Sequence, residues 1–223
     1  MEPIEFGEFL RRTGMDKHDL GFEKISKIEK IVSLRKIVKL LLPCAMPKNY
    51  LLKILQNIGT LGDPEHKVFR DAEFQFLRTD PNGLLVGQTF VSRPKYTALM
   101  EGFQHIFAGS TLPRGFSKLT PQIVLGEDAD GQAVLANYVP PIFEVHDGNP
   151  VIMDGIHRNF IILNAGTTIE SIVIRDIATP FPCRPMSWEK ISVVDVKPEK
   201  MEDRYFDLCH ELFRDLKSVG IDG

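Results

Sequence analysis

Five consecutive residues, Asp154-Gly155-Ile156-His157-Arg158, bring together groups that can do chemistry. A carboxylate can hold a metal ion, a glycine lets backbone approach a ligand closely, and imidazole and guanidinium groups donate hydrogen bonds to anions. The run follows the apolar segment Val151–Met153 and precedes Asn159–Ala165, so it lies at a predicted strand-to-helix junction. The unpaired N–H groups and the dipole at a helix start favour an anion, and we expect phosphate there.

The segments around this run predict the elements that position it. Ile142–Val145 and Val151–Met153 are separated by the turn residues Asp147-Gly148-Asn149, which is the pattern of a β-hairpin. Gly166 ends the predicted helix, because glycine adopts a left-handed cap at little cost. Ile169–Ile174 predicts one more strand. The sequence therefore predicts the order strand, strand, tight turn, helix, strand.

This order of elements, with Pro140-Pro141-Ile142 ahead of it and the Asp154–Arg158 run at its centre, resembles the ParB/sulfiredoxin superfamily over residues 83–177. Sulfiredoxins carry a Gly-Cys-His-Arg loop at this position and bind ATP phosphates there. Relatives that phosphorylate free serine carry Asp-Gly-His-His-Arg, and ParB partition proteins use a related loop for CTP. Ile156 replaces the sulfiredoxin cysteine, and isoleucine cannot be a thiol nucleophile, which excludes sulfinic-acid repair by that mechanism.

The resemblance implies an α+β fold, a ParB/sulfiredoxin-like small mixed sheet with packed helices, for a nucleotide-binding core in residues 79–178. It also implies a set of residues that contact the phosphates of ATP or another nucleotide. These are Gly155, Ile156, His157, Arg158 and, in the first turn of a helix that Ser92 is predicted to cap, Lys95.

Further roles follow from the same resemblance. Asp154 is expected to cap the helix or to help hold Mg²⁺, while His157 clamps phosphoryl oxygens. The serine-kinase relatives use an upstream carboxylate to orient the acceptor, and Glu101 and Glu144 are the candidates for it. The expected catalytic residues are therefore Asp154, His157, Glu144 and Glu101, and Asp154 is the expected metal ligand.

The leading functional hypothesis is nucleotide binding, with ATP as the first choice, followed by phosphoryl transfer to a small-molecule or protein acceptor or by nucleotide hydrolysis. Such chemistry requires mainly positioning and charge neutralisation, which this loop can supply. The first alternative is a non-catalytic nucleotide- or nucleic-acid-binding accessory module, and the second is a ParB-like nuclease. No helix-turn-helix pattern follows the core, which argues against a partition protein that reads DNA.

Composition narrows the class of protein. The chain of 223 residues is 43% apolar and 26% charged, which is typical of a globular fold, and its net charge of −3 argues against a protein that coats nucleic acid. Cys44, Cys183 and Cys209 are widely spaced and form no disulfide framework, which favours a reducing cytoplasm. No apolar run is long enough to cross a bilayer, so we expect no membrane partner.

The regions on either side of the core are predicted to be mostly helical. Residues 1–78 are interpreted as an N-terminal helical region, in which the stretch Phe22–Leu42 contains a break near Val32–Ser33. Its second half gathers basic residues opposite the apolar stripe, and a solvated face is favoured over a nucleic-acid contact. These residues are Arg35, Lys36 and Lys39.

Two further segments complete the expected organisation. Residues 109–138 are interpreted as a hairpin inserted into the core, with a solvated acidic turn at its tip. Residues 179–223 are interpreted as a C-terminal extension that ends in a long amphipathic helix, Glu199–Val219, because its apolar positions recur at spacings of three and four.

Overall fold

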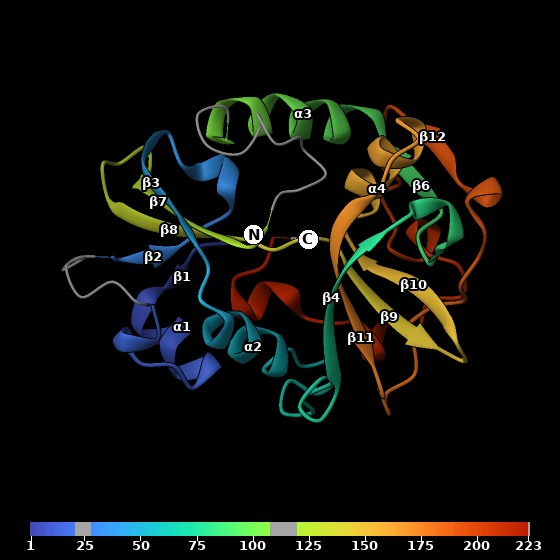
Figure 1. Cartoon of the computed structure of the whole chain (residues 1–223), viewed down its shortest axis with the longest axis horizontal. Coiled ribbons are helices and arrows are strands. Elements are labelled where there is room, and N and C mark those ends of the chain that lie inside the picture. The colour runs from blue at the N-terminus through green and yellow to red at the C-terminus, as the bar shows by residue number, and fades with distance from the viewer. Residues whose placement is uncertain (21–27, 108–119, 223) are drawn as a thin grey trace. The chain divides into compact units, whose positions relative to one another are not determined.

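The computed structural model describes residues 1–20, 28–107 and 120–222, and the chain divides into two compact units (Figure 1). Unit 1 consists of Met1–Arg70, Thr120–Val139 and Arg214–Gly223, and unit 2 of Asp71–Leu119 and Pro140–Phe213. The fold is α+β, with helices and mixed sheets. Each unit is built from segments far apart in the sequence, so the units do not follow the linear division at residues 78 and 178.

Unit 1 contains a five-stranded sheet in the order β1-β2-β8-β7-β3. Its strands are β1 Ile4–Glu5, β2 Lys30–Ile31, β3 Lys39–Ala45, β7 Gln122–Glu127 and β8 Ala133–Tyr138. Its helices and 3₁₀ turns are α1 Phe6–Thr13, α2 Lys48–Gln56, η1 Lys17–Leu20, η2 Leu34–Lys36 and η9 Leu216–Val219. The expected hairpin is present as β7 and β8, but it belongs to this sheet and not to the sheet of unit 2. Residues 109–119 of that expected insertion lie outside the described residues.

The prediction of a helical N-terminal region is wrong for most of Phe22–Leu42. Residues 21–27 lie outside the described part of the chain, and the rest forms β2, η2 and the start of β3. The apolar run that suggested a second helical stripe pairs with β7, because a β-branched and leucine-rich segment also fits a pleated surface. The three basic residues share no helix face: Lys39 Nζ lies 2.8 Å from Glu127 Oε1, whereas Arg35 lies 3.7 Å from Asp222 Oδ2.

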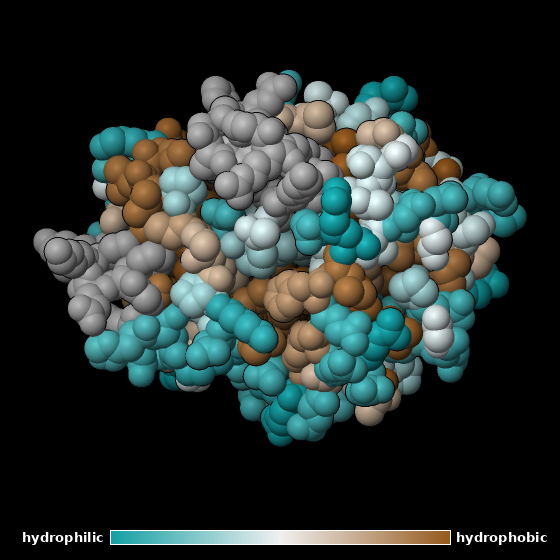
Figure 2. All heavy atoms as spheres, viewed as in Figure 1, coloured by the Kyte–Doolittle hydropathy of each residue, from teal (hydrophilic) through white to brown (hydrophobic). Residues whose placement is uncertain are grey.

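Strand β3 forms an edge of this sheet, and it exposes, together with the residue before it, four large apolar side chains. They are Val38, Leu40, Leu41 and Leu42, and hydrophobic surface over this part of unit 1 is visible in Figure 2. A register shift between Leu40 and Leu42 bends the strand, and Pro43 has no N–H group. Both features oppose the addition of another strand at this edge.

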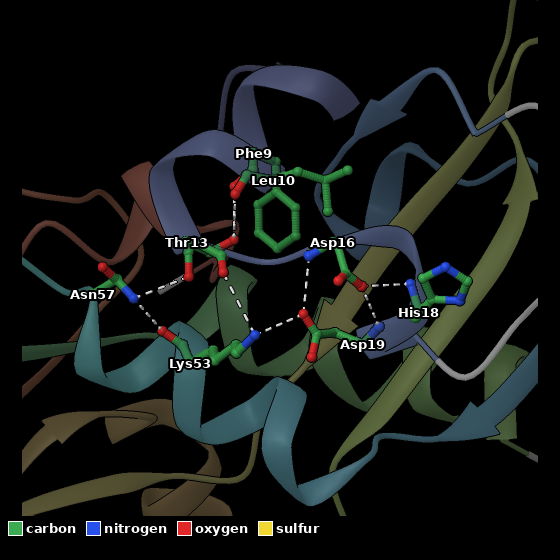
Figure 3. A network of polar contacts seen from close by, with 9 residues as sticks. Phe9, Leu10, Thr13, Asp16, His18, Asp19, Lys53 and Asn57 are labelled. Carbon is green, nitrogen blue, oxygen red and sulfur yellow. Dashed lines mark hydrogen bonds and ion pairs between the residues drawn. The ribbon is translucent and has the colours of Figure 1, made fainter.

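The two helices of unit 1 are joined by apolar and polar contacts. The rings of Phe9 in α1 and Tyr50 in α2 lie 6.1 Å apart and are fully buried. Around them, Asn57 Nδ2 donates to the carbonyl oxygens of Thr13 (3.1 Å) and Lys53 (2.9 Å) (Figure 3). Lys53 Nζ pairs with Asp19 of η1 at 2.7 Å and donates to Gly14 O, at the end of α1, at 3.5 Å, so one residue of α2 contacts both α1 and η1.

Unit 2 contains a second five-stranded sheet, in the order β4-β11-β9-β10-β5, and a parallel pair formed by β12 and β6. Its strands are β4 Glu73–Thr79, β5 Leu85–Val86, β6 Phe90–Ser92, β9 Ile142–His146, β10 Asn149–Asp154, β11 Ile169–Arg175 and β12 Ser192–Val194. Its helices are α3 Arg93–Phe107 and α4 Ile156–Asn164, and its 3₁₀ turns include η3 Pro81–Gly83, η6 Trp188–Lys190, η7 Glu202–Arg204 and η8 His210–Leu212.

The elements predicted around the Asp154–Arg158 run are confirmed. Strands β9 and β10 form the hairpin, and its turn residues Asp147 and Gly148 have φ values of 51° and 78°, as a type I′ turn requires. Helix α4 follows β10 directly and packs on the sheet, since Ile156 joins a buried cluster with Phe143 and Ile152. Strand β11 then pairs in parallel with β9.

The predicted helix Glu199–Val219 is wrong: this segment forms the short turns η7, η8 and η9, with extended chain between them. The backbone groups near Tyr205 bond to the connection after β5 and not within a helix. Phe206 N–H donates to Gly87 O (3.0 Å), and Thr89 N–H donates to Arg204 O (2.9 Å). Long-range bonds of this kind replace the intrahelical ladder, and an apolar spacing of three and four cannot reveal them.

None of the helices in the described ranges is long and apolar enough to cross a membrane.

Candidate functional site

A bulge and a glycine shape the backbone between β10 and α4. The register of β10 against β9 shifts between Ile152 and Asp154, so Asp154 comes opposite Ile142. Bulges of this kind redirect the side chains that follow them. Gly155 then adopts φ 89°, and a Cβ atom there would lie 2.9 Å from Pro141 Cβ and 3.0 Å from Arg158 Nη2. The turn therefore needs glycine both for its conformation and for space.

Helix α4 begins with a cap that has no side chain. Its first backbone hydrogen bond runs from Asn159 N–H to Gly155 O at 2.9 Å, so the amides of residues 156–158 precede the intrahelical ladder. These amides carry the positive end of the helix dipole. Asn159 Nδ2 donates to the same carbonyl at 3.0 Å, and its Oδ1 is a buried acceptor without a partner among the described atoms.

Asp154 and Arg158 form a buried ion pair across this turn. Arg158 Nη2 lies 2.8 Å from Asp154 Oδ2, and the two side chains are only 10% and 8% exposed. The pair places a permanently charged guanidinium at the first turn of α4, because arginine does not lose its proton in proteins. It also means that the carboxylate expected to cap the helix or hold Mg²⁺ already accepts a hydrogen bond from arginine.

His157 is buried between α4 and β6. Its Nε2 accepts a hydrogen bond from Ser92 N–H at 3.1 Å, which leaves the ring proton of the neutral imidazole on Nδ1. Burial, together with the positive charges of Lys95, Arg158 and Lys197, lowers the pKa of His157 to about 3. The ring is thus neutral at pH 7, and Nδ1 is the donor that it can offer to a ligand.

The pKa of His157 predicts a pH-dependent stability. As the pH falls below 6.5, a histidine in the unfolded chain, with a pKa near 6.5, binds a proton, whereas the buried His157 stays neutral. The stability that the neutral ring contributes is therefore complete above about pH 6.5 and is lost as the pH falls towards 3. The loss reaches about 1.4 kcal/mol at pH 5.5. Urea unfolding at pH 7 and pH 5.5 should show this difference for the wild type and not for His157→Gln. The matched control is His210→Gln, an exposed histidine of the same unit.

Two lysines reach this place from different parts of the chain. Strands β6 and β12 run in parallel with Val194 opposite Ser92, so both strands end at the same edge. Lys95 follows in the first turn of α3, and Lys197 follows shortly after Asp195, whose carboxylate pairs with Arg93 at 2.8 Å. Both lysines depress the pKa of His157, in accord with this placement. The sequence predicts Lys95 at this site. It does not predict Lys197, because the position of Lys197 depends on the pairing of β12 with β6.

Tyr205 is a second residue that the sequence analysis missed. Burial, with smaller contributions from Cys183 and Asp154 that Arg204 opposes, raises the pKa of Tyr205 to about 12. The phenol therefore remains protonated at pH 7 and can donate a hydrogen bond. Its backbone is held by the bonds to the connection after β5, and its ring contacts Phe213 at a centroid distance of 5.0 Å.

The two candidate carboxylates for acceptor activation lie elsewhere. Glu144 is fully buried on β9, where its Oε2 lies 2.7 Å from His146 Nε2. It alternates with Phe143, which packs in the cluster that includes Ile156, so Glu144 faces the side of the sheet away from α4. Glu101 is exposed on α3, beyond the first turn that carries Lys95. The structure therefore gathers Asp154, Gly155, His157 and Arg158 at the start of α4, with the charge of Lys95 acting on His157, but it places neither glutamate there.

Within residues 1–20, 28–107 and 120–222, no group of three or more histidine, cysteine, aspartate or glutamate side chains is arranged to hold a metal ion. Asp154 is the only carboxylate of the loop. Magnesium in nucleotide sites is commonly held by one or two carboxylates together with phosphate oxygens. The loop alone therefore supplies at most one protein ligand.

Comparison with known proteins adds no family assignment to this geometry. No protein-family model, no curated protein and no solved structure matches the chain.

Proposed function

We propose that unit 2 binds the phosphate groups of a nucleotide, with ATP as the first candidate, at the Asp154–Arg158 loop. The observation that carries the proposal is the position of Arg158 in the first turn of the glycine-capped helix α4, where the charges of Lys95 and Lys197 also act on His157. Positive side chains and the amides of a helix start both attract an anion. The buried, neutral imidazole of His157 adds a donor without adding to the charge repulsion among the cations.

The local backbone fits a phosphate group. Gly155 allows Pro141 and Arg158 to pack against the helix start, so a phosphate bound there would lie beside the Arg158 guanidinium and near the amides of residues 156–158. Bound nucleotide would supply the phosphate oxygens that a Mg²⁺ ion needs in addition to Asp154. The roles assigned to this chain are to bind the phosphates with Arg158 and Lys95, to orient them against α4, and to hold a proton on His157 Nδ1.

Two reaction outcomes belong to this proposal. Phosphoryl transfer or hydrolysis uses charge neutralisation, which the cations supply, together with a group that orients the attacking oxygen. The non-catalytic binding module is favoured by a specific observation. Asp154 is bonded to Arg158, His157 Nε2 is bonded to Ser92, and both candidate glutamates lie outside the cluster. Binding is thus the better supported half of the proposal.

Thermal unfolding with a panel of ATP, ADP, CTP and GTP, each with and without Mg²⁺, tests the proposal. A ligand that binds only the folded protein raises the free energy of unfolding by about 2.7 kcal/mol at a concentration of 100 times Kd. We expect a rise for at least one nucleotide and a smaller rise at high salt. Absence of any shift across the panel would refute nucleotide binding. Release of inorganic phosphate in the same samples distinguishes an enzyme from a binding module.

Lys197 provides a milder test of the same site. Replacing it by methionine removes one exposed positive charge near His157, which is worth roughly 0.2–1 kcal/mol, or up to about fivefold in the Kd for ATP. Titration calorimetry of Lys197→Met against Lys200→Met measures this effect. Lys200 is also exposed, so equal affinities of the two variants would remove Lys197 from the site.

A further inference from the structure

A groove of about 450 Å³ lies between α3, α4 and β12 in unit 2. One wall carries Tyr96 and Met100 of α3, and the other carries Phe160, Ile161 and Asn164 of α4, with Val193 of β12 at its side. Met100 and Val193 are 41% and 40% exposed, so apolar side chains face solvent at its opening. Its size falls within the range of small-molecule sites.

The groove lies on the same face of α4 as His157, farther from the start of the helix. Phe160 and Ile161 come three and four residues after His157, and Asn164 comes three and four residues after them, so the four residues share one face of the helix. From His157 to Asn164 this face extends about 10 Å, enough for a nucleoside. On the facing helix, Tyr96 comes immediately after Lys95. A ligand with its phosphates at the start of α4 would thus place its remaining part along this groove.

The walls suit a flat aromatic ring. The rings of Tyr96 and Phe160 lie 5.8 Å apart with an angle of 40° between their planes, and Phe160 lies 6.3 Å from Trp188. Such side chains offer stacking surfaces to any base, because every base has a π-face. Asn164 donates its amide nitrogen to Phe160 O at 2.7 Å, so its orientation at the end of the groove is fixed by the helix.

We propose that this groove holds the base of the nucleotide and makes the site selective for nucleotides over simple polyphosphates. This inference rests on the phosphate site proposed above. The ring lies against Tyr96 and Phe160, while the phosphates remain at the start of α4. Arg93, which also lines the groove, is held in place by its ion pair with Asp195.

Calorimetric titration of the full chain with inorganic tripolyphosphate and with ATP, GTP and CTP tests the inference. The best-bound nucleotide should bind the wild type roughly ten- to a hundredfold more tightly than tripolyphosphate, the range expected for base stacking on aromatic side chains. Met100→Trp and Asn164→Trp fill the groove from opposite walls at exposed positions. Both should reduce nucleotide affinity to that of tripolyphosphate and leave tripolyphosphate affinity unchanged.

The matched control is Leu77→Trp, which adds the same ring at a residue of β4 that is 42% exposed and does not line the groove. It should retain the preference for the nucleotide. Equal affinity of the wild type for tripolyphosphate and every nucleotide, or no effect of either groove variant, would overturn the inference and leave the phosphate site standing. A wild type that binds none of these compounds would overturn the phosphate site and the groove together.

Discussion

Replacing Arg158 by alanine is expected to lower the free energy of unfolding by about 3–5 kcal/mol. The reason is the carboxylate left behind. Asp154 is only 8% exposed, and its Oδ2 accepts a hydrogen bond from Arg158 at 2.8 Å. Without the guanidinium, a buried negative charge has lost its partner, and such a charge is strongly destabilising. Urea unfolding at pH 7 measures the effect.

Two further variants separate the ion pair from other effects of the substitution. Arg184→Ala removes an arginine of the same unit whose ion pair with Asp207 is exposed, so the loss should be below about 1 kcal/mol. Combining Asp154→Asn with Arg158→Ala should recover part of the stability, because the neutral amide no longer needs a positive partner. If Arg158→Ala unfolds at the same urea concentration as the wild type, the buried pair does not stabilise the fold.

The same residue has a separate role in the proposed function. Arg158→Lys keeps a positive charge at the start of α4 but loses the planar group that can bind a carboxylate and a phosphate through parallel bonds. The sequence alone predicts Arg158 as an anion ligand, because an arginine at a helix start is suited to bind an anion. It does not show that Asp154 and Arg158 bond to each other across Gly155, because this depends on the bulge in β10. The structural role of Arg158 was therefore not predictable from residue types.

The elements around the loop were predictable because their signals are local. The turn residues Asp147 and Gly148 fix the hairpin, and Gly166 directly follows the end of α4. Strand pairing between distant segments leaves no such signal. Lys197 reaches the site only because β12 pairs with β6, and Tyr205 only because its segment bonds to Gly87 and its neighbours. The residues added by the structure all come from the segment that was interpreted as a C-terminal extension.

The prediction of a helix over Glu199–Val219 is wrong because its apolar spacing is not specific to helices. Apolar residues spaced by three and four also occur in a chain of short turns that covers a sheet, and helix propensity is a weak prior against tertiary contacts. Here the apolar residue Tyr205 contacts Phe213, and Asp207 takes a positive φ of 48° that interrupts helical geometry. The predicted basic helix face of Arg35, Lys36 and Lys39 is wrong for a similar reason, because these residues lie in η2 and β3 and not on one helix.

Gly155→Ala is expected to lower the free energy of unfolding by about 2–5 kcal/mol. The left-handed conformation at φ 89° costs an alanine roughly 1–2 kcal/mol. Crowding adds to this, because the new Cβ would lie 2.9 Å from Pro141 Cβ and 3.0 Å from Arg158 Nη2, and relieving such overpacking typically costs about 1–3 kcal/mol. The arginine must shift, which also disturbs its bond to Asp154. We therefore expect nucleotide affinity to fall along with stability.

Gly166→Ala is the matched control for the backbone term. Gly166 also has a positive φ, 59°, but no atom lies within 4 Å of the position that a Cβ would take. Its alanine variant should thus lose only the conformational part, roughly 1–2 kcal/mol, and should bind nucleotide like the wild type. Urea unfolding and calorimetric titration of the two variants give both quantities. Equal losses of stability at the two positions would show that the close approach of Pro141 and Arg158 to Gly155 adds nothing to the cost of an alanine at that position.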